Sequence, residues 1–339
     1  MHPKIATFVY TRGAPLVQSL PRSVAMRWAT ISGWAAVPFM AERRFLVERT
    51  ITRIEGELTP PQLRARVREA FACYSRYWIE SARLPATPAD VVDEGHDVVG
   101  YEHVQRGLDA GRGVILVLPH LGGWEWSAFW LARINHVRVT AVVEPLQPPE
   151  LMEWFVSFRR SLGMNIVPLG PQAGQEVLAA LRRNEIVCLL ADRDVNGAGV
   201  DVQFFGEKTT MPGGPATLAL RAGVPLCPTA VYFHGRHGHR GVVRPPLDLT
   251  RTGRMRADVS RLTQQVADEL ADLIRQAPAQ WHLMQPNWPS DDIALAEFRA
   301  RRRAPWRAAR RKAAMKAAMK AVMKAASTAL SRLGASAHR

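Results

Sequence analysis

Residues 114–126 read Val-Ile-Leu-Val-Leu-Pro-His-Leu-Gly-Gly-Trp-Glu-Trp, and the rest of the chain can be placed around them. The first five residues are apolar and mostly β-branched, which predicts a buried strand. Pro119 ends that strand because it has no N–H to donate. His120 therefore lies at the carboxyl end of the strand, and two glycines separate it from a helix with Glu125 in its first turn. The stretch predicts a strand–loop–helix with an ionisable pair at its bend, where α/β sheets place ligands.

The His120–Glu125 pair has a chemical and a structural interpretation. On one continuous helix, residues five apart lie about 140° apart around the axis, but the glycine corner lets these two side chains meet. A carboxylate on one ring nitrogen would fix the tautomer, and the other nitrogen could take a proton from an attacking hydroxyl. Neither Ser nor Cys lies between them, so an acyl-enzyme is not required. The alternative is a capping histidine beside a first-turn glutamate that interacts with the helix dipole.

The composition is typical of a globular protein in a reducing compartment. The chain has 339 residues, of which 47% are hydrophobic, an ordinary fraction for a chain with a sizeable core. Three scattered cysteines, Cys73, Cys188 and Cys227, are too few for a disulfide framework or a zinc site. A cytoplasmic location follows.

The positive charge is concentrated at the end of the chain. Residues 299–339 contain nine Arg, four Lys and no acidic residue, so residues 1–298 retain only about two of the formal net charge of +15. Ala-Ala-Met-Lys repeats at 313–324 predict a helix with adjoining Lys and Met ridges. Such a basic tail suits an anionic membrane surface, and a solvated extension is the alternative. Nucleic-acid binding is not favoured, because no recognised module or aromatic interleaving accompanies the charge.

The first part of the chain predicts helices. Residues 23–53 predict a helix broken near Gly33 and Pro38, and 60–83 predict an amphipathic helix with Thr59 as its N-cap. Residues 28–41 are apolar, but the run is shorter than the roughly 20 residues that span a bilayer. Its large aromatic residues predict core packing, with a lipid-facing surface as the alternative.

From Val98 onward, strand and helix patterns alternate. Strands are expected at 114–118, 137–143, 166–169, 186–191, 225–233 and 240–245, and helices at 101–109, 124–133, 149–162, 175–183, 215–222 and 256–275. This order is typical of an α/β fold with a central, mostly parallel or mixed sheet flanked by helices. We therefore predict one domain over residues 1–298, with a helical part at about 20–95, an α/β core at 96–298 and the basic tail at 299–339.

Other polar clusters occur in this part of the chain. Asp192, Arg193 and Asp194 follow the strand 186–191, so charged side chains again lie at a carboxyl end. His234, His237 and His239 lie among Gly and Arg in a predicted loop. A solvated turn is the expectation for this loop, and a metal site is the weaker alternative because no acidic or Cys partner is nearby.

Several motifs resemble those of one enzyme family. The stretch 119–125 looks like the first, His-x4-Glu motif of the bacterial lipid acyltransferases, which include lipid A lauroyl/myristoyl and phosphatidylinositol mannoside acyltransferases. Similar stretches follow in the right order over roughly residues 20–298: 143–145, 158–163, 190–194, 204–206 and 211–215. The residues at 191–194 and 202–206 are more similar to the phosphatidylinositol mannoside acyltransferase branch than to the lipid A branch.

The resemblance implies roles for particular residues. His120 would be the general base and Glu125 its partner; Arg159, favoured over Arg160, would orient the site or meet donor phosphates. The remaining substrate-binding residues would be Glu144, Asp192, Arg193 and Asp194. No metal and no cofactor are expected, because acyl-CoA would be the co-substrate.

The implied function is transfer of a fatty acyl chain, expected to be palmitoyl, from acyl-CoA to a mannose hydroxyl of phosphatidylinositol mannoside. The implied fold is like that of the glycerolipid acyltransferases, and the implied location is peripheral, on the cytoplasmic face of the cell membrane. Two alternatives stay open: a lipid A precursor or other glycolipid as acceptor, and a non-catalytic basic protein that binds membranes or nucleic acid.

Overall fold

A computed structural model describes residues 13–144, 149–195, 197–235 and 237–303. Two compact units are present, Met1–Pro289 and Ser290–Arg339. The boundary between them therefore follows Pro289, whereas the sequence predicts a boundary after residue 298. The described part of the second unit, residues 290–303, is helical. The Lys and Met repeats of the tail and residues 145–148 lie outside the described residues.

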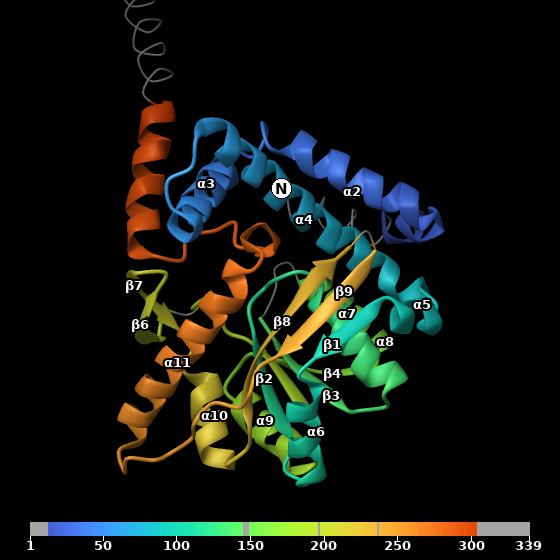
Figure 1. The fold of residues 1–339 in the computed structure, drawn as a ribbon, viewed down its shortest axis with the longest axis vertical. Helices are drawn as coiled ribbons and strands as arrows, with labels where there is room; N and C mark the ends of the chain where they lie inside the picture. The colour runs from blue at the N-terminus through green and yellow to red at the C-terminus, as the bar shows by residue number, and fades with distance from the viewer. Residues whose placement is uncertain (1–12, 145–148, 196, 236, 304–339) are drawn as a thin grey trace, which may run out of the picture. The chain divides into compact units, whose positions relative to one another are not determined.

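The first unit is built on a central sheet, seen in Figure 1. Among the described residues its seven strands follow the order β1-β9-β8-β2-β5-β3-β4, and all neighbours are parallel except β8 and β9. The predicted α/β class with a mostly parallel sheet is confirmed. The strands are β1 (His96–Val99), β2 (Val114–Leu118), β3 (Val139–Val143), β4 (Met164–Pro168), β5 (Ile186–Leu190), β8 (Leu226–His234) and β9 (Gly238–Val243).

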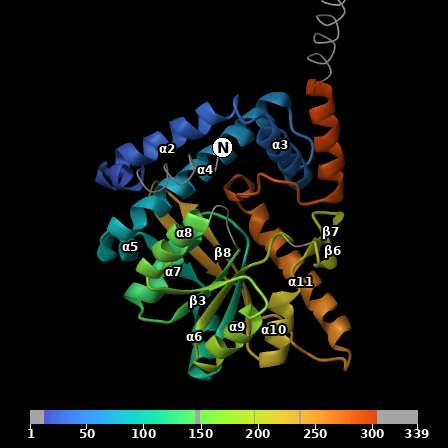
Figure 2. The same ribbon diagram turned by 180° about the vertical axis from the view of Figure 1, so that it is seen from behind.

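Helices cover both faces of the sheet (Figures 1 and 2). Alternate residues of β2 point to opposite faces, so Ile115 and Val117 pack into one core, while Leu116 and Leu118 pack into the other. The first core is closed by α9 (Ala173–Arg182), α10 (Gly214–Ala222) and α11 (Met255–Arg275). The second is closed by α5 (Ala89–Glu94), α6 (Tyr101–Asp109), α7 (Trp124–Phe129), a π-helical turn (Trp130–Ile134) and α8 (Pro149–Ser161).

A separate antiparallel hairpin, β6 (Val200–Phe204) and β7 (Glu207–Met211), packs beside α11. Phe205 and Gly206 form its turn, and both have positive φ angles, 52° and 78°. Such angles suit the two central residues of a tight hairpin turn. The alternating apolar and polar residues at 200–206 are typical of an edge strand or hairpin arm, and the structure forms the hairpin.

Three long helices precede the sheet: α2 (Arg22–Ala36), α3 (Ala41–Glu55) and α4 (Pro60–Arg83). The bounds of α4 agree with the prediction, and Gln62 Oε1 accepts the Thr59 backbone N–H at 2.9 Å as part of a capping box. The predicted break between α2 and α3 falls after Ala36, and Gly33 lies inside α2. No helix in the described ranges is both long and apolar enough to cross a bilayer.

The histidine loop is shorter than predicted, because His234 is the last residue of β8 and His239 belongs to β9. His239 lies in β9 and is buried, with Nε2 3.0 Å from Glu80 Oε2 and its ring stacked on Trp126. The expected solvated turn is therefore wrong for His239, because β9 pairs with β1 and carries the side chain under α4. Within the described ranges, no three His, Cys, Asp or Glu side chains come together as metal ligands.

Gly33 allows α2 and α4 to approach closely, and this generates a prediction. A Cβ at Gly33 would lie 2.5 Å from the Phe71 carbonyl oxygen, closer than packed atoms tolerate. We expect Gly33→Ala to lower the free energy of unfolding by about 1–3 kcal/mol in urea denaturation. The matched control is Gly174→Ala in α9, where nothing lies within 4 Å of an added Cβ. Equal stability of the two variants would contradict the close approach.

Candidate active site

His120 and Asp192 are brought together by two neighbouring strands. Leu118 at the end of β2 is paired with Leu190 at the end of β5 in a parallel register. His120 and Asp192 each lie two residues beyond these partners. Their side chains meet, with His120 Nδ1 2.6 Å from Asp192 Oδ1. The register of the sheet therefore sets this contact.

The Asp192 carboxylate is fixed from both sides. It is fully buried, and its Oδ2 accepts the Trp281 indole N–H at 2.7 Å. Burial alone would raise its pKa, but the charge of His120 and the hydrogen bonds from His120 and Trp281 hold the pKa of Asp192 well below its usual value. An ionised carboxylate only accepts, so Nδ1 of His120 carries the proton and Nε2 is left as the basic nitrogen.

The expected contact between Glu125 and His120 is not formed. Glu125 is buried at the start of α7, and its Oε1 accepts the Tyr77 hydroxyl at 2.8 Å and an Arg159 N–H at 3.0 Å. The reason is that the helix after the glycine corner turns Glu125 toward α4 and α8. Nδ1 of His120 is already bonded to Asp192, which follows β5. The partner of His120 is therefore Asp192, and the role of Glu125 as a direct partner is corrected.

Arg159 projects from α8 into the same region. Its guanidinium lies 5.0 Å from the Trp124 ring and 5.4 Å from the Phe155 ring, positions typical of cation–π contacts. Burial disfavours its charge, but the Glu125 carboxylate raises the pKa of Arg159 above its ordinary value. Arg160 is exposed on the other side of the helix, so Arg159 is the arginine of the pair that lies at the site.

The other predicted residues also lie at the carboxyl edge of the sheet. Arg193 and Glu144 form an ion pair with a 3.0 Å contact and line the same groove as His120. Asp194 accepts the backbone N–H groups of Gly197 and Gly199 and the hydroxyl of Thr210. Its carboxylate thus holds the loop that forms one edge of the groove.

The groove itself has a volume of about 650 Å³. Aromatic side chains of α4 form one wall and the segment from Pro212 to Arg221 forms part of the other. His120, Glu144, Arg159, Arg193 and Asp194 are among its lining residues, whereas Asp192 is buried behind His120. The structure therefore brings the predicted site residues to one region, but neither Asp192 nor Glu125 is exposed to a ligand there.

Three residues of this site were not predicted from the sequence: Tyr77, Trp281 and His282. His282 donates Nε2–H to the Gly122 carbonyl at 2.8 Å, and its backbone N–H bonds to the His120 carbonyl. Burial lowers the pKa of His282 to about 4, so its ring is neutral. Burial and then the Glu125 carboxylate raise the pKa of Tyr77 well above its usual value. The one sequence signal for them is the Trp-His pair at 281–282, which lies shortly after α11.

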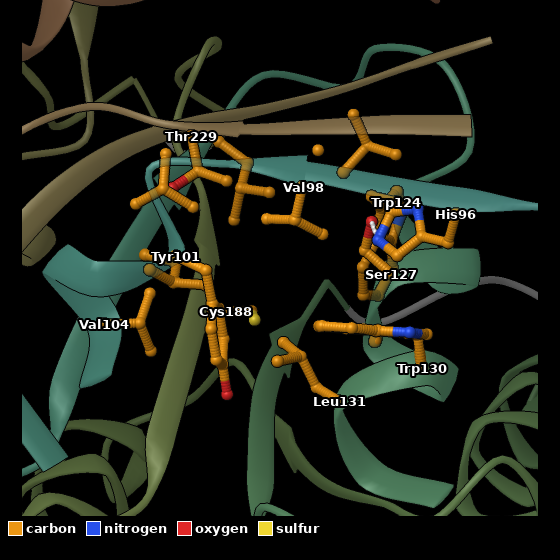
Figure 3. A pocket seen from close by; sticks show the side chains of 16 residues that line it. His96, Val98, Tyr101, Val104, Trp124, Ser127, Trp130, Leu131, Cys188 and Thr229 are labelled. Carbon is orange, nitrogen blue, oxygen red and sulfur yellow. Dashed lines mark hydrogen bonds between the residues drawn. The ribbon is translucent and has the colours of Figure 1, made fainter. Parts of the chain in front are cut away.

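A small apolar cavity of about 40 Å³ lies on the α6–α7 side of the sheet (Figure 3). Side chains from β2, β5, β8 and β9 form its floor, and Figure 3 shows Trp130, Leu131 and Tyr101 around it. Trp124 lines this cavity and also contacts Arg159, which lines the groove. Two tryptophans of the stretch 124–130, Trp124 and Trp130, line the cavity. Trp126 instead stacks on His239.

This arrangement combines a basic imidazole nitrogen, an open polar groove and an adjoining apolar cavity. It suits an enzyme that activates a hydroxyl group next to a long apolar substrate. Comparison with known proteins agrees with that class. The chain belongs to the bacterial lipid A biosynthesis acyltransferase family, whose sequence profile it matches over residues 1–290. It is therefore an acyltransferase, and the resemblance seen in its motifs is confirmed.

Three relatives show where in the family it lies. The phosphatidylinositol mannoside acyltransferase of Mycolicibacterium smegmatis is 39% identical over 286 residues, covering 83% of this chain and 91% of the relative. That of Mycobacterium tuberculosis is 38% identical over 315 residues, covering 83% and 96%. A lipid A biosynthesis acyltransferase of Haemophilus influenzae is 24% identical over 192 residues, covering 55% and 56%.

Two buried histidines predict how stability depends on pH. Burial lowers the pKa of both His96 and His282 to about 4, whereas an unfolded histidine titrates near 6.5. Between these values the unfolded chain binds more protons, so the free energy of unfolding falls as pH is lowered from about 6.5 to about 4. We expect His96→Gln to reduce this fall in the free energy of unfolding by an amount on the order of 2–3 kcal/mol. Urea denaturation at a series of pH values measures it.

The control for this measurement is His136→Asn. His136 is exposed and has a positive φ of 53°, a conformation that Asn tolerates. Its substitution should leave the pH dependence unchanged. A His96→Gln protein with the wild-type pH dependence would show that His96 does not resist protonation in the folded state.

Proposed function

We propose that this protein transfers a fatty acyl chain, expected to be palmitoyl, from acyl-CoA to a mannose hydroxyl of phosphatidylinositol mannoside. The observation that carries the proposal is the His120–Asp192 pair, which leaves Nε2 of His120 for the groove. The named activity of the relatives that share 38–39% identity with this chain supports the acceptor.

His120 acts as the general base. Its Nε2 takes the proton of the mannose hydroxyl while the oxygen attacks the thioester carbonyl carbon. The carbon–sulfur bond then breaks, and the CoA thiolate leaves and takes the proton from the imidazolium. The products are the acylated glycolipid and CoA. Asp192 stabilises the imidazolium and fixes its orientation, as the carboxylate of a catalytic triad does.

The tetrahedral oxyanion requires hydrogen-bond donors, and the corner after His120 supplies backbone N–H groups at Gly123 and Trp124. His282 holds the carbonyl of Gly122. In a trans peptide the N–H of the next residue points the opposite way from that carbonyl. His282 thus fixes the direction of the Gly123 N–H, and a pre-oriented donor stabilises developing charge without reorganisation.

The acyl chain enters the apolar cavity beside Trp124, which widens to hold it because the cavity is small before the substrate binds. Its lining is almost entirely apolar and it lies next to the groove through the Trp124–Arg159 contact. Glu125 serves this arrangement indirectly, because its ion pair with Arg159 holds α8 against α7. Arg159 in turn borders the groove, where a guanidinium suits the phosphates of the donor.

The open groove receives the head groups of donor and acceptor. The Glu144–Arg193 pair lies on its surface and offers both an acceptor and a donor to sugar hydroxyls or phosphates. Asp194 acts by holding the neighbouring loop. No cofactor is required for this chemistry.

A peripheral location on the cytoplasmic face of the membrane completes the proposal. The basic tail would bind anionic lipids there. A lipid A precursor as acceptor is the second candidate, favoured only by the more distant relative. A non-catalytic binding protein is disfavoured by the intact His120–Asp192 pair.

The assay that tests this function compares wild type with His120→Ala and Asp192→Asn. Labelled palmitoyl-CoA is supplied with phosphatidylinositol mannoside or a lipid A precursor, and label in each acceptor is measured. We expect label only in the mannoside, none with His120→Ala, and a kcat lowered about 10³–10⁴-fold with Asp192→Asn. Circular dichroism checks that each variant is folded.

Glu125→Gln is the matched carboxylate-to-amide variant. Its amide oxygen still accepts the Tyr77 hydroxyl, so we expect a smaller loss of kcat than with Asp192→Asn. An active Asp192→Asn protein together with an inactive, folded Glu125→Gln protein would reverse the two roles. Transfer of label to the lipid A precursor alone would show that the acceptor is a lipid A precursor and not the mannoside. The proposed acyl-transfer chemistry would still hold.

Removal of residues 299–339 tests the tail. We expect binding to vesicles containing phosphatidylinositol to fall and to become less sensitive to salt, while turnover of a soluble acceptor analogue persists. A full-length variant with Lys312, Lys316, Lys320 and Lys324 all changed to Gln should show a milder form of the same effect. Loss of all turnover in the folded, truncated protein would show that the tail does more than bind membranes.

A further inference from the structure

Helix α2 has two apolar faces, of which only one is packed. Ala25, Ala29 and Gly33 recur at four-residue spacing and are buried. They lie against α4, where the Ser32 and Ser75 hydroxyls also meet at 2.8 Å. Small side chains on this face let the two helix backbones approach closely.

The opposite face carries large apolar side chains that are exposed. Ile31 is 60% exposed and Trp34 51%, and Phe39 in the turn that follows is 87% exposed. Val24, Trp28 and Met40 complete this group, which we call the α2 outer face. Concentration of so many large apolar side chains in one short segment marks an interaction surface.

The two tryptophans of this face indicate what kind of surface it contacts. In the described ranges, neither the Trp28 nor the Trp34 indole N–H makes a hydrogen bond within the protein. A protein partner that buried these donors would have to supply a matching acceptor for each of them. At a membrane interface the ring lies among acyl chains while the N–H reaches head groups and water.

The charge around the α2 outer face is mainly positive. Residues 1–41 contain no Asp or Glu. Arg27 is exposed on α2, and both Glu42 and Arg43 are exposed at the start of α3. Two copies of this chain would therefore bring like charges together, which opposes self-association. Anionic lipid head groups instead complement the arginines.

We propose that the α2 outer face docks on the surface of an anionic lipid bilayer, with α2 lying in the plane of the interface. A helix with an exposed apolar face flanked by arginine is suited to this position. The proposal does not depend on acyl transfer, because it rests on the exposed face and its charge.

Docking there would also set the position of the groove. Helix α4 contacts α2 at Phe71 and Ala72, and it lines the groove with Tyr74, Tyr77 and Trp78. Figures 1 and 2 both show α2 and α4 side by side. The helix that holds the docking face therefore also forms a wall of the site, which keeps the groove close to the lipid head groups.

The test is vesicle sedimentation of the full-length protein, without acyl donor. The vesicles are phosphatidylcholine with or without phosphatidylinositol. We expect the triple variant Trp28→Gln, Ile31→Gln and Trp34→Gln to lower the partition coefficient about tenfold or more. The loss should persist at high salt, which screens the contribution of the basic tail. Phe39→Gln, at the most exposed side chain, should give a smaller loss and guards against misfolding of the triple variant.

The matched control is Val99→Gln, which removes a 54% exposed apolar side chain at the end of β1 and should bind vesicles as wild type does. Analytical ultracentrifugation without lipid tests whether a second copy of the chain, rather than a bilayer, covers this face. Unchanged vesicle binding of the folded triple variant would overturn the proposal. So would a wild-type dimer that the triple variant converts to monomer, since the face would then cover a second copy.

Discussion

The hydrogen bond between His120 Nδ1 and Asp192 constrains the rest of the site. It exists because β2 and β5 are parallel neighbours whose last residues are in register. A slip of one residue between these strands would carry one of the two side chains toward the other face of the sheet. Trp281 holds the far oxygen of Asp192, and the neighbouring His282 holds the loop after His120. The segment after α11 therefore fixes both members of the pair, although it lies about 90 residues further along the chain than Asp192.

Because Nδ1 of His120 is bonded to Asp192, Glu125 pairs with Arg159 instead. Its buried ion pair with Arg159 takes two charges out of water, which is costly unless hydrogen bonds compensate. Tyr77 supplies one such bond, and Trp124 and Phe155 cover the guanidinium. Three helices, α4, α7 and α8, are joined at this one carboxylate. The His-x4-Glu spacing thus combines a reactive residue with the residue that assembles the walls around it.

Much of the fold could be predicted from local patterns. The bounds of α4 and β2 follow from a capping box and an apolar run, because these signals depend only on neighbouring residues. The pairing of His120 could not be predicted in the same way. Strand order is not local, and nothing in the sequence says that the strand at 186–190 lies beside that at 114–118. Spacing favoured Glu125, five residues away, over Asp192, which only the sheet brings near. His239 was likewise assigned to solvent because its partner Glu80 lies on a distant helix.

Helix α2 shows a different limit. Its apolar residues predicted core packing, and periodicity alone does not say which of two apolar faces is covered. The answer lies in side-chain size. Only the small face can enter the narrow space against α4, since a single Cβ at Gly33 would already collide with the Phe71 carbonyl. The large residues are therefore forced outward. Because α4 then presents Tyr74, Tyr77 and Trp78 to the groove, the same close packing that exposes Trp28 and Trp34 also positions the aromatic wall of the site.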